Sequence, residues 1–191
     1  PGACLSPTNT KKEPKVKARL TLVALVALSS LPAMVHAQQC ATGYVPVTVT
    51  GRTTTINVSP TRQVGQLCLV MTRADGREIF DDCGALIGNI TSQNPETGTS
   101  TLSHTAVFDL TQSFQTEGDA AQVTGVLDYD SDGNPCAMSA TERITKFKWG
   151  TGFFAGATID TVVNGTISFC PNRNLNTFHL NGTACVRQPK R

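Results

Sequence analysis

Short runs of Val, Ile, Thr and Phe, separated by turn residues, recur along most of the chain. Tyr44–Thr50 alternates apolar and polar residues, as a strand with one buried face does, and Gln66–Thr72 is apolar enough to be buried on both faces. The best helical segment, Ser139–Thr145, is short and is supported only by a capping box of Ser139 and Glu142. The pattern therefore predicts roughly ten short strands, an all-β fold and an antiparallel sandwich or barrel.

Two features of the C-terminal half refine this prediction. Asn164-Gly165 and Asn181-Gly182 each separate two strand-like runs. Because Asn and Gly tolerate positive φ angles, both pairs are expected to form tight hairpin turns. Glu142–Trp149 alternates charged and apolar residues, so one face of this segment is expected to contact water.

The N-terminal segment predicts export. Lys11–Arg19 is basic, Leu20–Leu31 is apolar, and Val35-His36-Ala37 supplies the small residues of a signal-peptidase site. The apolar core is shorter than the roughly 20 residues that a membrane span needs. We expect a secreted or periplasmic protein with no membrane span in the mature chain. The expected parts are residues 1–10 as an over-extended reading frame, 11–37 as the signal peptide, 38–186 as one β-barrel domain and 187–191 as a basic tail.

The cysteine pattern agrees with export. Six cysteines follow the predicted signal peptide, and no two of them form a C-x-x-C pair of the kind common in zinc sites. An even number of separated cysteines favours three disulfides in an oxidising compartment. The pairing is left open, except that Cys170 and Cys185 flank a predicted hairpin connection and are expected to pair. The six cysteines are Cys40, Cys68, Cys83, Cys136, Cys170 and Cys185.

The net charge argues against a nucleic-acid partner. The whole chain of 191 residues has a net charge of +2, but residues 1–37 contain five of the 16 Lys and Arg residues and one of the 14 Asp and Glu residues. Residues 38–191 therefore have a net charge of −2. A nucleic-acid-binding domain would need a basic surface, which this balance does not favour.

An acidic loop is the sharpest short motif. Asp128, Asp130 and Asp132 alternate with other residues, and Gly133 and Asn134 follow. Carboxylates at this spacing before a Gly can surround a hard cation, so Asp128, Asp130, Asp132 and Asn134 are candidate ligands for Ca²⁺. The spacing does not fit an EF-hand, since no Glu stands at the twelfth loop position. The alternative is an acidic turn in contact with water.

The sequence contains no complete catalytic motif. No Ser lies in a G-x-S-x-G nucleophile elbow. The Gly-rich segment Gly150–Thr158 lacks the spacing of a nucleotide-binding loop and is followed by a strand-like run. We expect it to be a close strand crossing at which Phe153 or Phe154 fills a core. No cofactor other than Ca²⁺ is expected.

The C-terminal half resembles a known family. Gly150–Thr158 (GTGFFAGAT), Gly165-Thr166-Ile167 and Thr177–Thr183 (TFHLNGT) are similar to the barrel shared by dirigent proteins and allene oxide cyclases, and most similar to small exported bacterial relatives. Leu102–Phe108 and Phe114–Asp119 resemble the preceding strands, so the resemblance covers roughly residues 84–186. It implies an eight-stranded antiparallel barrel with an apolar cavity, and a family that steers or cyclises hydrophobic substrates without a cofactor. It assigns no catalytic residue to this chain.

Three functions remain open, and the first is favoured. It is a secreted barrel that binds a small hydrophobic ligand or a partner surface and has no catalytic set. The second is a structural or adhesive surface protein with a solid interior. The third is a cofactor-free enzyme of the dirigent or cyclase type, with His104, Asp109 and His179 as the candidate acid or base groups. The residues expected to line the ligand cavity are Phe147, Trp149, Phe154 and Phe169.

Overall fold

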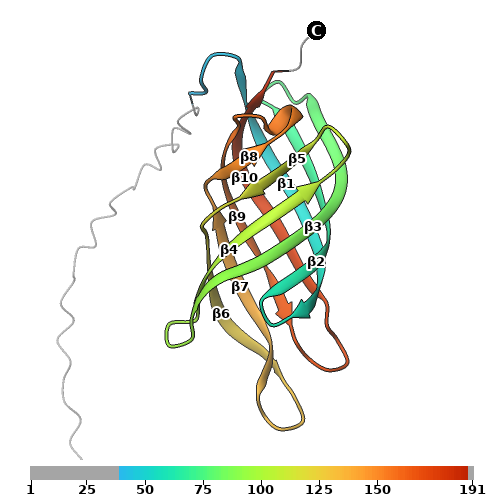
Figure 1. The fold of residues 1–191 in the computed structure, drawn as a ribbon, viewed down its shortest axis with the longest axis vertical. Helices are drawn as coiled ribbons and strands as arrows, with labels where there is room; N and C mark the ends of the chain where they lie inside the picture. Colours follow the sequence, from blue (N-terminus) through green and yellow to red (C-terminus); the bar gives the residue numbers. More distant parts are fainter. Residues whose placement is uncertain (1–38, 189–191) are drawn as a thin grey trace, which may run out of the picture. The chain divides into compact units, whose positions relative to one another are not determined.

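The computed structural model describes residues 39–188, in which ten antiparallel strands account for most of the chain (Figure 1). The predicted all-β antiparallel class is confirmed. No α-helix occurs within residues 39–188, and residues 139–144 of the best helical candidate, Ser139–Thr145, lie in strand β7. The elements are β1 (Tyr44–Ser59), β2 (Arg62–Arg73), β3 (Glu78–Asn94), β4 (Thr99–Val107), β5 (Ser113–Thr116), β6 (Asp119–Tyr129), β7 (Pro135–Ile144), β8 (Phe147–Gly150), the 3-10 turn η1 (Gly152–Phe154), β9 (Thr158–Ser168) and β10 (Asn176–Arg187).

Eight of the strands form a closed ring. Neighbouring strands pair in the order β3-β2-β1-β10-β9-β7-β6-β4. A further pairing between β4 and β3, in which Ala106 lies opposite Leu86, closes the ring. The short strands β5 and β8 extend from β4 beside η1, at the upper end of Figure 1. The β3–β4 and β6–β7 hairpins lie at the opposite end, which we call the lower end. The ring is completed by the pairing of β4 with β3 on one side and with β6 on the other.

Alternating residues fill the inside of the ring. Successive side chains of a strand point to opposite faces, so every second residue of β1 and β2 faces inward. Thr53 and Thr55 of β1 are buried polar residues in this inward row. The other buried inward residues of the two strands are apolar and at most 8% exposed: Val45, Val47, Val49, Leu67, Leu69 and Met71.

Phenylalanine side chains close the upper end. Phe154 of η1 is completely buried, and its ring centroid lies 4.9 Å from that of Phe114 and 5.4 Å from that of Phe80. Phe108 and Phe147 pack on the same ring at 5.7 and 5.9 Å. The expectation that a phenylalanine of the Gly-rich segment fills a core therefore agrees with this packing. This end of the ring is filled with side chains.

The two Asn-Gly pairs do not form turns, so that prediction is wrong. Gly165 and Gly182 lie within β9 and β10, and neither has a positive φ. A Cβ on Gly165 would lie 2.1 Å from the carbonyl oxygen of Thr177, and one on Gly182 would lie 2.2 Å from that of Asp160. Glycine is needed here because the neighbouring strands approach too closely for a side chain.

The prediction of three disulfides is confirmed, but the expected Cys170–Cys185 pair is wrong. Cys185 of β10 bonds to Cys40, which precedes β1, and Cys170 bonds to Cys136 at the start of β7. The third bond joins Cys68 of β2 to Cys83 of β3, which lie directly opposite each other. Because Asn181-Gly182 does not form a turn, β10 continues without interruption through Cys185, which lies within bonding distance of Cys40.

Some predicted parts lie outside the described residues: the extension (residues 1–10), the signal peptide (residues 11–37) and residues 189–191 of the tail. Arg187, expected in the tail, is the last residue of β10 and lies opposite Tyr44 of β1. Within residues 39–188, no helix is long and apolar enough to cross a membrane.

Candidate functional site

Ionisable side chains interrupt the apolar inner face of the ring at one place. On β4, His104 faces inward between Leu102 and Ala106 and is 8% exposed. On β7, Glu142 faces inward next to Ile144 and is 9% exposed. Both occupy positions that strand alternation reserves for apolar residues, so each must be stabilised by polar neighbours.

Asp119 brings the second carboxylate to this place. It is the first residue of β6 and follows Gly118, whose φ of 75° allows the tight connection from β5. The turn directs Asp119 back into the ring, where it is 1% exposed. Thr116, the last residue of β5, is completely buried beside it. We call His104, Asp119 and Glu142 the interior cluster.

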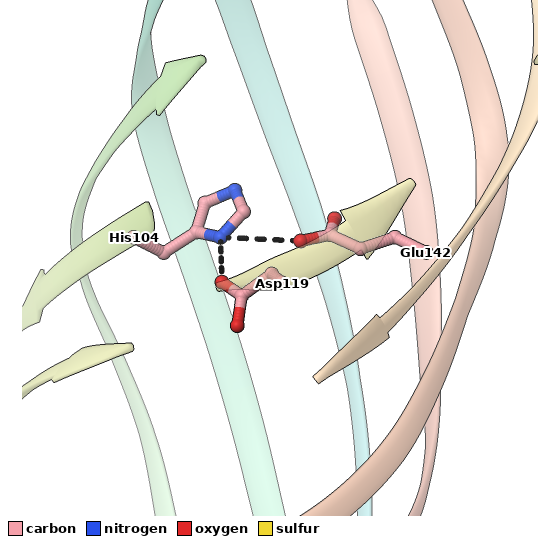
Figure 2. Close-up of side chains that lie close together, drawn as sticks. All are labelled: His104, Asp119 and Glu142. Atoms are coloured by element: carbon pink, nitrogen blue, oxygen red, sulfur yellow. Dashed lines mark hydrogen bonds and ion pairs between the residues drawn. The ribbon is translucent and has the colours of Figure 1, made fainter. Parts of the chain in front are cut away.

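Figure 2 shows both carboxylates directed at the same imidazole nitrogen. Nδ1 of His104 lies 3.0 Å from Oδ2 of Asp119, within hydrogen-bond distance, and 3.4 Å from Oε1 of Glu142. The Thr116 hydroxyl donates a hydrogen bond to Oδ2 of Asp119 and accepts one from the His104 amide at 2.8 Å. Asp119 is therefore held by two partners, whereas Glu142 approaches the imidazole without a hydrogen bond.

Burial and charge act together on the protonation of this cluster. Burial acts to lower the pKa of His104, but the charge of Glu142 and the hydrogen bond and charge of Asp119 outweigh it, and the pKa is raised above its ordinary value. Burial raises the pKa of Glu142, and the charge of Asp119 adds to this, against the attraction of His104. His104 and Glu142 therefore retain protons at a pH at which exposed groups of the same types release them.

Two carboxylate oxygens of the cluster have no hydrogen-bond partner. They are Oδ1 of Asp119 and Oε1 of Glu142, and both are inaccessible to solvent. An unpaired buried acceptor costs about 1–3 kcal/mol, and more when it is charged. The two atoms mark a place where a proton, a cation or a hydrogen-bond donor would be favourably bound.

A small apolar cavity adjoins the cluster, and we call it the inner cavity. Its volume is about 40 Å³, which is room for a few water molecules. His104, Thr116 and Glu142 form part of its wall. The rest of the wall is mostly apolar and includes Leu67, Leu69, Leu86, Ile144, Phe178 and Leu180.

A second cavity, the outer cavity, lies toward the lower end of the ring and measures about 60 Å³. Its wall includes Ile90, Val123 and Phe169. Among the described lining residues, Gln63 is the one shared by both cavities. Oε1 of Gln63 accepts hydrogen bonds from the Thr55 hydroxyl at 2.6 Å and from the Asn176 amide at 3.3 Å. Gln63 thus stands between the two spaces.

The candidate acid and base residues do not come together. His104 faces the inner cavity, as described above. Asp109 is exposed in the β4–β5 connection, where Thr111 and Gln112 donate hydrogen bonds to its carboxylate and lower its pKa. His179 is exposed on β10. Of the three candidates, only His104 is placed to meet a molecule inside the ring.

The four aromatic residues expected to line one cavity are also dispersed. Phe154 and Phe147 belong to the phenylalanine cluster at the upper end. Trp149 is 43% exposed, and its indole N–H donates a hydrogen bond to Gln115. Phe169 is 44% exposed and lines the outer cavity. The inner cavity is lined by aliphatic residues and by Phe114 and Phe178 instead.

The acidic loop (Asp128–Asn134) satisfies its own polar groups. Oδ1 of Asp130 accepts the amide hydrogens of Asp132 and Asn134 at 2.9 and 2.8 Å. Asp128 forms an ion pair with Arg173 at 3.1 Å. Within residues 39–188, the interior cluster is the one group of three acidic or His residues whose ligand atoms converge within 4.8 Å. The loop has the geometry of a hydrogen-bonded turn.

Sequence reasoning missed Asp119, Glu142 and Thr116. Glu142 was expected on a face in contact with water, and this is wrong, because it alternates inward with Ile144. A charged residue in register with apolar inward residues is the signal that could have found it. No comparable signal marks Asp119, whose direction depends on the turn at Gly118.

Comparisons of this chain with models of protein families, with curated proteins and with solved structures found no match.

Proposed function

We propose that this chain is an exported β-barrel protein that binds a small, mainly apolar molecule inside the ring, with a hydroxyl or amino group of that molecule at the interior cluster. The observation that carries the proposal is the inner cavity. It is largely apolar, and its wall includes Glu142, which has an unpaired buried oxygen. A pocket of this composition binds ligands by apolar contact and orients them by a few polar groups.

The unpaired oxygen of Glu142 specifies the polar group of the ligand. Oε1 of Glu142 is an acceptor on a residue of the cavity wall, so it is satisfied by a ligand that donates a hydrogen bond. A site of this kind rejects an analogue that lacks the donor, because this oxygen is then left unpaired. The ligand class is therefore a small alcohol, phenol or amine with an apolar body.

Room for such a ligand comes from joining the two cavities. Gln63 lines both, and two hydrogen bonds hold its side-chain oxygen. Rotation of Gln63 toward the lower end would join spaces of about 40 and about 60 Å³. Engineered apolar cavities of about 150 Å³ bind benzene, so a ligand of one ring needs only modest further expansion.

Export is supported by two observations of different kinds. Three disulfides are typical of proteins in oxidising compartments. The basic and apolar pattern of residues 11–37 is typical of a secretory signal peptide. The resemblance to dirigent proteins and allene oxide cyclases supports a barrel that holds a hydrophobic molecule.

The test compares phenol with toluene, which has a similar body without the hydroxyl. Phenol is expected to raise the melting temperature saturably and more than toluene does. The Glu142→Leu variant is expected to lose this preference, and the exposed control Glu117→Gln to keep it. Equal effects of phenol and toluene on the wild-type protein would refute the cluster as the anchor. No effect of either would favour a structural protein with a solid interior.

A second candidate function is cofactor-free acid–base catalysis, favoured by the position of His104. Asp119 fixes the imidazole, and His104 and Glu142 share the cavity wall. A group in this position can exchange a proton with a bound molecule. The test follows solvent deuterium uptake at the α-carbon of acetophenone by NMR. If the cluster is catalytic, deuterium uptake is expected to be faster with the wild-type protein than with His104→Gln. The His179→Gln variant is expected to match the wild type.

A further inference from the structure

We propose that the interior cluster is a binding site for one divalent transition-metal ion, with Nδ1 of His104 and the carboxylates of Asp119 and Glu142 as its three protein ligands. The site goes beyond the binding of an organic ligand, and it is tested by a separate measurement.

The first argument is the convergence of the ligand atoms. One atom from each of the three residues lies within 4.8 Å of the others. Nδ1 of His104 is 3.0 Å from Oδ2 of Asp119 and 3.4 Å from Oε1 of Glu142. Ligands at about 2.0–2.2 Å from a zinc ion are themselves roughly 3–3.5 Å apart, so only small movements would be needed to place an ion between them. Figure 2 shows the three groups facing one another.

The second argument is the charge of the cluster. With both carboxylates ionised, its net charge is negative whether or not His104 is protonated. Among the described residues that line the inner cavity, none is Lys or Arg. A buried negative charge without a cation is unfavourable, and a metal ion would neutralise it. One of the three proposed ligand atoms, Oε1 of Glu142, is already an unpaired buried oxygen.

The third argument is that the surrounding structure fixes the donors. Thr116 donates to Asp119 and ties it to the backbone of His104. Outer partners of this kind orient metal-binding side chains. The Nε2 edge of the imidazole packs against Gly88 of β3, where an added Cβ would lie 3.1 Å from Nε2. The imidazole is therefore held with Nδ1 toward the carboxylates.

The donor set indicates the class of metal. One imidazole nitrogen and two carboxylate oxygens suit Zn²⁺, Mn²⁺ or Fe²⁺ better than Ca²⁺, which prefers oxygen ligands alone. Three protein ligands leave at least one coordination position open, on the side of the inner cavity. The oxygen of a ligand hydroxyl in that position would bind the metal.

The test is titration of untagged, EDTA-treated protein with Zn²⁺ in a calorimeter, followed by Co²⁺ titration monitored by visible absorption. The six cysteines of residues 39–188 all form disulfides, so they supply no thiolate that would compete for the metal. Saturable binding of one ion per chain is expected. Glu142→Gln is expected to weaken binding by about 100-fold or more, the upper end of the effect of losing an outer partner.

Two matched controls separate the interior cluster from surface binding. His179→Gln removes an exposed histidine and Asp160→Asn an exposed carboxylate, and both are expected to bind like the wild type. X-ray absorption of the zinc-loaded wild-type protein should show nitrogen and oxygen ligands with one imidazole, and it needs no variant to fold. Absence of saturable binding, equal affinity in Glu142→Gln, or a spectrum without imidazole would each overturn the metal site. The preference for phenol over toluene can survive that result, because it depends on Oε1 of Glu142 as a hydrogen-bond acceptor and not on a bound ion.

Discussion

The interior cluster and the acidic loop (Asp128–Asn134) are two places where acidic residues gather, and they differ in burial and in hydrogen bonding. The loop is exposed, and its groups are satisfied by hydrogen bonds within the turn and by an ion pair with Arg173. The cluster is buried, contains two unpaired oxygens, and has no basic residue other than His104 among the described lining of its cavity. The loop is conspicuous in the sequence, whereas the cluster is assembled from three strands.

This difference shows what marks a candidate site. Three aspartates in seven residues are easily recognised, but an exposed turn has water and its own amides as partners. Ionisable groups spaced along β4, β6 and β7 leave no trace in local sequence, yet their burial makes each missing hydrogen-bond partner costly. Unsatisfied burial is therefore the better indicator of ligand binding than local acidic density.

The largest expected effect comes from removing Asp119. Asp119→Ala takes away the hydrogen-bonded partner of His104 and Thr116 in the interior. Breaking a buried charge pair in this way destabilises a protein by about 3–5 kcal/mol. Asp130→Ala in the acidic loop should lower stability much less, because water replaces the lost acceptor. Urea denaturation of both variants measures the difference. Equal losses would show that the cluster is no more coupled to the fold than the loop is.

A second, opposite effect is expected from Glu142. Glu142→Leu removes the carboxylate that approaches His104 without a hydrogen bond and leaves the Asp119 interaction in place. The free energy of unfolding of the metal-free protein is expected to rise by about 1–3 kcal/mol, the cost of an unpaired buried acceptor. The exposed control Asp132→Leu should not show this gain. A large loss of stability in Glu142→Leu would indicate that Glu142 is already paired.

The dependence of stability on pH should also distinguish the two regions. His104 and Glu142 have raised pKa values, so the folded protein binds more protons than the unfolded chain. Their contribution to the free energy of unfolding is fully present at acidic pH. It is lost as the pH rises from the ordinary pKa, about 4.3 for Glu142 and about 6.5 for His104, through the higher pKa of the folded state.

Asp130 behaves in the opposite way. Hydrogen bonds from Asn134 and Asp132 lower its pKa, so its contribution to stability is present at neutral pH and is lost as pH falls through the folded-state pKa.

Thermal melts in EDTA from pH 4 to 9 should show a melting temperature that declines toward alkaline pH in the wild type. The decline should be smaller in Glu142→Leu and unchanged in Asp130→Asn. A decline of the same size in Glu142→Leu would remove Glu142 as its cause.

The fold class was predictable because strand alternation is local. Val, Ile and Thr runs such as Tyr44–Thr50 define strands without knowledge of their partners. The strand pattern alone did not predict the closure of the ring, which only the family resemblance implied, or the pairing of Cys185, since both depend on which strands meet across the fold. The turn prediction for the Asn-Gly pairs was wrong because Gly is common both in turns and where two strands approach closely. Only the position of the neighbouring backbone at Gly165 shows which of the two applies.

The candidate site was predictable only in part for the same reason, because it depends on contacts between strands that are distant in the sequence. His104 was a candidate because histidine is uncommon in this chain and can titrate near neutral pH. Glu142 could have been recognised from its place in an inward row, had the alternation of β7 been read from Ala140 to Ile144. Asp119 could not, because the turn at Gly118 decides whether its side chain faces inward or outward.

The smallest expected effect is that of Ca²⁺ on the acidic loop. Both carboxylate oxygens of Asp130 accept hydrogen bonds within the loop, and Asp128 is paired with Arg173. A Ca²⁺ ion would have to replace these partners and gather oxygens that do not converge, so millimolar Ca²⁺ should leave the melting temperature unchanged. Asp130→Asn, which keeps the acceptor Oδ1 but removes the charge, is the matched control. A saturable rise with Ca²⁺ that is absent in Asp130→Asn would show that the loop rearranges to bind the ion. The contrast between a self-satisfied loop and an unsatisfied interior would then no longer hold.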